Sequence, residues 1–306
     1  AAHRAGTSEE SMFGPAPRGR ILLTHDVDAV RKTSAIRIKQ AAFHCFNALR
    51  RAASPASRSR AGESLRRAST MLFRRESYFQ FAQIASAERL ASRRSIFNVC
   101  APGQPRRWLM DPSYDIESPR LRRTLSTLHL EGWGVGVHPS YDAWRDPAEI
   151  RGQMERIAAA IGHRPVVGRQ HWLRFSWRDT WRAQERAGLQ LDSTAGFNDR
   201  PGFRLGSALV ARPWLRGSTE GPADTLQVVP MVLMDSHLHD YGDLDQTTRH
   251  DAIRGWMSEV AFVGGAVSVV WHQRVFGNDY GWGESYHDLL GVIEELGLTD
   301  LRLDGR

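Results

Sequence analysis

The sequence predicts an α/β protein built around a parallel sheet, either a barrel or a doubly wound sheet. Seven short apolar runs alternate with longer segments in which apolar residues recur at helical spacing. Several runs are apolar on successive residues, which is typical of strands buried on both faces. The chain of 306 residues shows no internal repeat and is long enough for one barrel of about 250 residues with room for an insertion.

The expected strands and helices follow one another along the chain. Strands are expected at residues 21–24, 95–99, 133–137, 165–168, 189–191, 226–231 and 266–271. Helices are expected at residues 78–91, 118–131, 147–161, 177–187, 247–263 and 284–296. Asp146 and Pro147 form a typical helix start. Glycines stand where helices are expected to end, at Gly132, Gly162, Gly188 and Gly297.

Residues 30–76 interrupt this alternation with an unusually long link after the first strand. We expect an N-terminal tail at residues 1–19, then a single domain at residues 20–306 with a basic helical insertion at about residues 30–76. Apolar residues recur there at helical spacing, at Ile38, Ala42, Phe46 and Leu49, with Phe43 beside them. The favoured interpretation packs this stripe on the domain, with a solvated linker over residues 52–67. The alternative is a basic amphipathic helix, at residues 35–51, that contacts a membrane surface or an acidic partner.

The charge is distributed unevenly. The formal net charge is +7, and all but two of the 41 basic residues are arginine. Residues 1–110 carry 20 basic and 7 acidic side chains, whereas residues 111–306 carry 21 and 27. The basic part lacks an aromatic–basic recognition motif, so we expect no specific nucleic-acid partner. The apolar content excludes a disordered chain, and Cys45 and Cys100 could form one disulfide at most.

The sequence also predicts the location of the protein. No stretch reaches the roughly 18 apolar residues of a transmembrane helix, and the first 20 residues lack the apolar run of a signal peptide. We therefore expect a cytoplasmic protein, which could contact the inner face of the membrane through the insertion. The oligomeric state is left open.

Candidate catalytic side chains follow the expected strands. The first strand ends in Thr24-His25-Asp26-Val27-Asp28. The carboxyl ends of parallel strands carry the active site in α/β folds. Two carboxylates this close repel one another unless a cation or a proton separates their roles, so a metal ligand beside a general base is one solution. A helix N-cap or a turn would explain the same pair without chemistry.

Four further strand ends carry similar residues. His138 follows the third strand, Arg169 and His171 follow the fourth, and the last two sites are Asp192 and His272. Each alone has a structural explanation, such as a buried histidine or an N-cap. Five polar strand ends in one chain are harder to explain by packing alone. Tryptophans near these positions, including Trp172 and Trp271, could stack on a sugar or pack in the core.

In this order, these residues resemble the motifs of the polysaccharide deacetylase family (the NodB homology domain, carbohydrate esterase family 4). The resemblance covers about residues 20–297. The opening Thr-His-Asp-Val-Asp at residues 24–28 and the His-Pro-Ser-Tyr at residues 138–141 are similar to the motifs of a divergent bacterial branch of this family, which is linked to surface-polysaccharide synthesis. The resemblance implies a distorted (β/α)7 barrel and a metal-dependent hydrolase that removes N-acetyl groups from a sugar, polysaccharide or glycan precursor.

The resemblance also implies roles for single residues. Asp26 matches the general base, Arg169 the arginine that orients it, and His272 the general acid. The implied ligands of a divalent metal are Asp28, His138 and His171, with Zn²⁺ the expected ion and Co²⁺, Ni²⁺ or Fe²⁺ as alternatives. The family's second motif has a further histidine where this chain has Asp142, so Asp142 is the alternative third ligand.

The remaining site predictions concern substrate and activity. Substrate contacts are expected from Asp192, which matches the fourth motif, and from Tyr141, Trp172 and Trp271. Two other activities stay open. One is hydrolysis of another amide on the same fold, and the other is glycan binding by an inactive homologue that has lost the metal.

Overall fold

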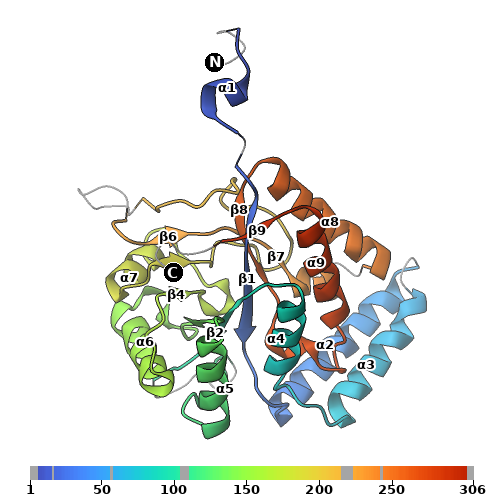
Figure 1. The fold of residues 1–306 in the computed structure, drawn as a ribbon. Helices are drawn as coiled ribbons and strands as arrows, with labels where there is room; N and C mark the ends of the chain where they lie inside the picture. Colours follow the sequence, from blue (N-terminus) through green and yellow to red (C-terminus); the bar gives the residue numbers. More distant parts are fainter. Residues whose placement is uncertain are drawn as a thin grey trace.

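The protein is a distorted (β/α) barrel, as the sequence resemblance implied (Figure 1). A computed structural model describes residues 6–15, 17–55, 58–103, 110–214, 223–241 and 244–301. Its strands pair in the order β6-β5-β4-β3-β2-β1-β8-β7, with β9 added beside β1, and all these pairings are parallel. The strands are β1 (Arg20–Val27), β2 (Ile96–Val99), β3 (Gly134–Val137), β4 (Val167–Gly168), β5 (Leu191–Asp192), β6 (Gln227–Val228), β7 (Met231–Met234), β8 (Ala266–Val270) and β9 (Thr299–Asp300).

One predicted strand is divided in two. The run at residues 226–231 contains β6 and the start of β7, separated by Val229 and Pro230. The amide of Val229 still donates to Asp192 at the end of β5, whereas the carbonyl of Pro230 accepts from Ser268 on β8. The chain thus changes neighbours within two residues. Because β6 and β7 are the two ends of the strand order, this short link connects the ends of the barrel wall.

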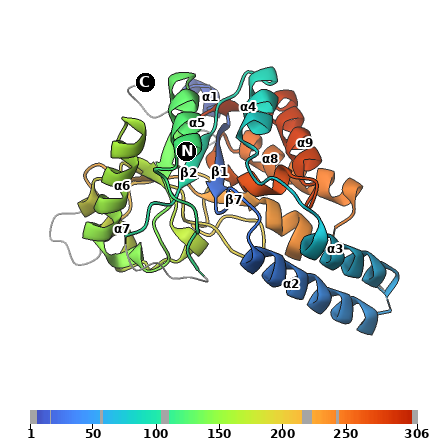
Figure 2. The same ribbon diagram turned by 90° about the horizontal axis from the view of Figure 1, so that it is seen from below.

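Helices cover the outside of the barrel (Figures 1 and 2). They are α4 (Phe81–Leu90), α5 (Pro119–Leu130), α6 (Pro147–Ile161), α7 (Thr180–Ala187), α8 (Gln246–Phe262) and α9 (Gly283–Glu295), close to the predicted ranges. The predicted ends of α6 are confirmed, since Asp146 accepts from the amides of Ala148 and Glu149, and Gly162 adopts a left-handed φ of 78°. A short helix, α1 (Glu9–Phe13), precedes the barrel in the predicted tail.

The insertion forms a helical hairpin at the carboxyl end of β1 (Figure 2). Its helices are α2 (Ser34–Ala53) and α3 (Ala61–Phe73), so most of the predicted linker is helical. They pack against one another through small side chains, and Tyr280 of the barrel contacts this packed seam at Ala41, Ala68 and Met71. At the base of the hairpin, Lys32 forms a buried ion pair of 2.6 Å with Asp279.

The apolar stripe of the insertion does not pack on the domain, which corrects the favoured interpretation of the sequence. Ile38, Phe46 and Leu49 are each more than 60% exposed. The contact face of α2 instead contains Ala41, His44, Asn47 and Ala48. Helical spacing identifies an apolar face but not its partner, and here the short side chains of α2 permit the close approach of α3. None of the helices described is both long and apolar enough to cross a membrane.

Candidate metal centre and active site

The end of β1 sends alternate side chains to opposite sides of the barrel wall. His25 points away from the barrel interior into a buried polar cluster around Glu88. The Glu88 carboxylate accepts hydrogen bonds from the side chains of Ser95, Trp133 and Tyr286, and it lies 2.9 Å from His25 Nε2. His25 is therefore a structural residue in this strand, and its neighbour Asp26 faces the interior.

Asp26 is a buried carboxylate that its neighbours keep ionised. Its Oδ1 accepts from Asn98 Nδ2 at 2.9 Å and from Arg169 Nη1 at 3.0 Å. Burial raises the pKa of Asp26. The positive charge of Arg169, with His138 and His272 nearby, lowers the pKa by more than burial raises it, so that its value is about 2. The carboxylate is thus available to accept a proton at neutral pH.

Arg169 holds this carboxylate from the centre of the barrel. Its guanidinium is fully buried and donates to Thr24, Asp26 and Ser268 and to the carbonyl of Ser193. These partners come from β1, from β8 and from the segment after β5. The predicted pairing of Arg169 with Asp26 is therefore present.

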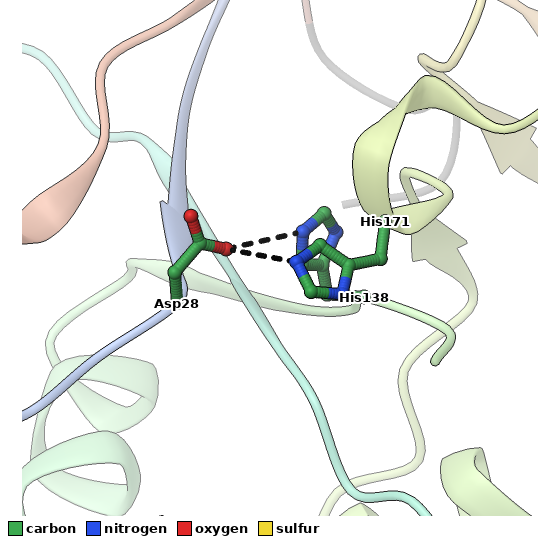
Figure 3. Close-up of side chains that lie close together, drawn as sticks. All are labelled: Asp28, His138 and His171. Carbon is green, nitrogen blue, oxygen red and sulfur yellow. Dashed lines mark ion pairs between the residues drawn. The ribbon is translucent and has the colours of Figure 1, made fainter. Parts of the chain in front are cut away.

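Asp28, His138 and His171 converge just after the end of β1 (Figure 3). Asp28 Oδ1 lies 3.5 Å from Nε2 of each histidine, and one candidate ligand atom per residue fits within 4.8 Å of the others. At this distance neither imidazole makes a good hydrogen bond to the oxygen. Asp28 Oδ1 is also buried without a hydrogen-bond partner among the residues described. One oxygen and two nitrogens that face a common point fit a divalent cation such as Zn²⁺.

The orientation of His138 supports this fit. Its Nδ1 lies 2.6 Å from the carbonyl oxygen of Arg169, so Nδ1 carries the proton that is donated to this acceptor. Nε2 then presents its lone pair toward Asp28, which is the tautomer a metal ligand needs. On the other side, His171 Nδ1 lies 3.7 Å from a carboxylate oxygen of Asp111.

The geometry separates the two candidates for the third ligand. His171 lies beside Asp28 and His138, whereas Asp142 is half exposed and its carboxylate accepts from Arg174 Nη1 at 2.6 Å. His171 begins a tight turn in which Trp172 and Leu173 have positive φ values of 59° and 48°. Such strained backbone in residues with side chains is uncommon and concentrates at functional sites. This turn places His171 at the candidate centre and leaves Trp172 46% exposed beside it.

His272 lies on the opposite side of Asp28. Its Nε2 is 3.6 Å from Asp28 Oδ2, and its Nδ1 is 2.9 Å from the carboxylate of Asp235. The backbone amide of His272 also donates to Asp235. Burial lowers the pKa of His272, but the charge of Asp235 and their hydrogen bond outweigh it, so that the pKa is raised above its ordinary value. The ring is thus favoured in its protonated form.

Two important residues were missed by the sequence reasoning. Asp235 follows directly after β7, and Arg274 stands two positions after His272 and bonds Asp28 Oδ2. Like the other candidates, Asp235 directly follows the carboxyl end of a parallel strand. It was overlooked because the run at residues 226–231 was read as one strand, which hid the true end of β7.

Two of the four expected substrate contacts are turned away from the site. Asp192 is fully buried, and its carboxylate accepts from Trp181, Gln184 and Thr194 beside α7. Trp271 is also fully buried, and its indole donates to the carbonyl of Trp282. In this structure both residues support the barrel wall. Trp172 is exposed beside His171, and the ring of Tyr141 is contacted by Arg174.

Comparisons with known proteins identify the fold. No family model matches the chain, and no curated protein matches its sequence. Among solved structures, a proposed polysaccharide deacetylase from Mycobacterium smegmatis shares 14% identity, with 96% of each chain covered and a TM-score of 0.51. A family 4 carbohydrate esterase from Streptomyces lividans, solved with acetate, shares 10% identity over 94% of this chain and 95% of its own, with a TM-score of 0.45.

A third similar structure is a peptidoglycan deacetylase from Bacillus subtilis. It shares 12% identity over 92% of this chain and 87% of its own, with a TM-score of 0.43. The Mycobacterium smegmatis likeness extends over nearly the whole chain and establishes that the chain has the fold of that protein. The fold implied by the sequence resemblance is therefore confirmed.

Proposed function

We propose that the protein is a metal-dependent hydrolase that removes N-acetyl groups from an N-acetylated sugar, polysaccharide or glycan precursor. The observation that carries the proposal is the arrangement around Asp28. Its Oδ1 faces the two imidazoles of His138 and His171, while the candidate base Asp26 lies 3.9 Å from His138 Nε2 and the candidate acid His272 lies 3.6 Å from Asp28 Oδ2. The residues proposed as ligands, base and acid thus lie within one site.

The candidate cation site would be formed by Asp28, His138 and His171. A divalent cation held there, Zn²⁺ in our proposal, would polarise the amide carbonyl and lower the pKa of a water molecule at the site. The chain supplies the acid–base chemistry. Asp26, ionised because of Arg169, would accept the proton of the attacking water.

His272 would complete the reaction. As the C–N bond breaks, the leaving nitrogen needs a proton, and the imidazolium held by Asp235 would donate it from Nε2. Acetate and a free amino sugar would be the products. General acid–base catalysis of this kind typically contributes about 10²–10⁴-fold in rate. The presence of both groups favours a hydrolase over an inactive glycan-binding homologue.

The N-acetylated sugar is inferred from two sources. The motif order resembles that of the polysaccharide deacetylases, and the Mycobacterium smegmatis protein that shares this fold is a proposed polysaccharide deacetylase by name. Within the site, Trp172 offers an exposed ring beside His171 on which a sugar face could stack.

Acetate release from N-acetylhexosamine conjugates tests the proposal. We expect the metal-loaded protein to release acetate, the chelated protein to be inactive, and restored metal to restore the reaction. Asp26→Asn should abolish acetate release while metal content is retained. Release of a different product from linear or cyclic amides, with none from acetylated sugars, would identify another amide hydrolase. No bound metal together with unchanged activity of Asp26→Asn would exclude this mechanism.

A further inference from the structure

The exposed apolar stripe of α2 belongs to a larger surface. Large apolar side chains are also exposed on α3, and the combined set, here called the hairpin face, comprises Ile38, Phe46, Leu49, Leu65, Leu72 and Phe73. Single exposed apolar residues are normal on protein surfaces. Six on two packed helices form a patch, and exposed apolar patches mark interaction sites.

The two helices present these residues on the same side. Each residue of an α-helix turns about 100° relative to the preceding one. On α2, the exposed apolar residues Ile38, Phe46 and Leu49 lie about 140°, in the N-to-C sense of rotation, from the buried residues that face α3. On α3 the exposed residues are displaced from the buried residues in the same sense, by about 110°. Because the helices run in opposite directions (Figure 2), rotations in the same sense bring both sets to one side of the hairpin.

The hairpin face is bordered by positive charge. Residues 30–76 contain 12 basic and 2 acidic side chains, whereas the rest of the chain contains 29 and 32. On the helical wheel, Lys39 and Arg50 border the apolar residues of α2, and Arg66 borders those of α3, all three exposed. An apolar face with a basic border is the pattern of helices that lie in the interface of an anionic membrane.

The hairpin is held as a rigid unit with its face outward. Arg37 Nη1 donates to the carbonyls of Leu72 and Arg74, which ties the start of α2 to the end of α3. The buried Lys32–Asp279 pair joins this end to the barrel. Docking would therefore require little ordering of the hairpin, and this limits the entropic cost of binding.

We propose that the hairpin face docks on an anionic lipid bilayer. The apolar side chains would enter the interface and the basic border would contact the headgroups. Lys39 also lies over the exposed ring of Trp172, with Nζ 4.6 Å from the ring centroid. Because Trp172 stands beside His171, the docked protein would hold its candidate active site next to the lipid surface. The proposal does not depend on the proposed reaction.

Vesicle binding tests the docking surface directly. Cys45 is exposed on α2 and Cys100 is buried, so an environment-sensitive fluorophore can be attached at Cys45. We expect a blue shift with vesicles of phosphatidylcholine and phosphatidylglycerol, and a much smaller one with phosphatidylcholine alone. Added salt should weaken the binding, since exposed charges are screened. Equal binding to both vesicle types, or none to the anionic type, would overturn the proposal.

Matched variants locate the surface. Leu49→Ser and Phe73→Ser change residues that are 73% and 79% exposed, one on each helix of the hairpin. Each should weaken binding about tenfold, the loss expected when one large apolar side chain no longer enters lipid. The controls are Leu130→Ser and Phe262→Ser, at residues 86% and 87% exposed near the opposite end of the barrel. Unlabelled protein in a vesicle sedimentation assay gives the same comparison without the fluorophore.

The controls also discriminate between lipid and protein partners. We expect the controls to bind vesicles like the unaltered protein, and the hairpin variants to retain its circular dichroism spectrum. Equal loss in the controls would contradict a specific face. If the protein is a dimer in solution that Leu49→Ser converts to a monomer, and vesicles are not bound, the face is an interface between two copies and the lipid proposal is wrong.

Discussion

Arg274 bonds one carboxylate oxygen of Asp28 and thereby leaves the other to the two imidazoles. Nη1 of Arg274 contacts Oδ2, whereas Oδ1 faces His138 and His171. The arginine fixes the rotation of the carboxyl group about its Cβ–Cγ bond. Asp28 Oδ1 is thus oriented toward the two imidazoles.

The first prediction concerns this orientation. Arg274→Met should weaken metal binding about 10- to 100-fold, the usual cost of removing a residue that orients a ligand. Competition with a chelator of known affinity measures the change. Arg174→Met is the control, because Arg174 pairs with the exposed Asp142 and not with Asp28, His138 or His171. Unchanged or tighter metal binding in Arg274→Met would show that the arginine does not orient Asp28 for metal binding.

Asp26 should be needed for proton transfer and not for metal binding. We expect Asp26→Asn to lower kcat about 10²–10⁴-fold, because the amide cannot accept a proton from water. Metal content, measured by elemental analysis, should be unchanged, since Asp28, His138 and His171 remain. A variant that is inactive because it has lost its metal would instead place Asp26 among the ligands.

The alkaline limb of the pH–activity profile should reflect the ionisation of His272. Since Asp235 raises the pKa of His272, the protonated acid persists above the ordinary histidine range and activity falls only at higher pH. Asp235→Asn removes the negative charge, so the pKa of His272 should fall and the alkaline limb of kcat/KM should move to lower pH. Asp142→Asn serves as the control. An alkaline limb at the same pH in Asp235→Asn would mean that another group limits the rate there.

The loss of activity at low pH should not reflect protonation of Asp26. Its pKa is lowered to about 2, so the carboxylate stays ionised until the pH approaches that value. Loss of activity between pH 4 and 6 must then come from protonation of other groups, such as the imidazoles of candidate ligands, which lose metal when protonated. Metal content measured across this range should therefore fall together with activity. Activity lost at constant metal content would contradict this assignment.

A stability prediction follows from the cluster around His25. Glu88→Ala removes a fully buried carboxylate that interacts with four side chains, and we expect the free energy of unfolding to fall by about 3–5 kcal/mol. Urea denaturation measures the loss. The matched change Glu131→Ala breaks an exposed pair with Arg89 and should cost no more than about 1 kcal/mol. Similar losses in both variants would refute the structural role of the cluster.

Much of the site could be predicted from one rule, which is that functional residues follow the carboxyl ends of parallel strands. It selected Asp26, Asp28, His138, His171 and His272 because parallel strands bring their carboxyl ends together. It did not resolve which side of the wall each residue faces. Trp271 and His272 are adjacent at the end of β8, yet only His272 lies beside Asp28. The two-residue period of strands separates such neighbours, but only once the register is known.

The hairpin illustrates a different limit. Residues 38–49 show the same apolar periodicity whether the stripe faces the barrel or the outside. The deciding contact is the packing of α2 against α3, and the sequence predicts a linker, rather than part of a second helix, over most of the residues between 52 and 67. The break at Val229 and Pro230 was hidden for a similar reason, since both halves of that run are apolar and only their pairing with β5 and β8 distinguishes them.

Arg169 has a consequence for anyone who redesigns this protein. Its guanidinium bonds groups from β1, from β8 and from the segment after β5, inside the barrel. Arg169 lowers the pKa of the candidate base and also holds the barrel strands together. We therefore expect substitutions of Arg169 to destabilise the fold. Trp172 and Lys39 are carried by a turn and by the inserted helix, and neither contributes to the wall. A mutant library aimed at new substrates should vary these two positions and keep the barrel interior constant.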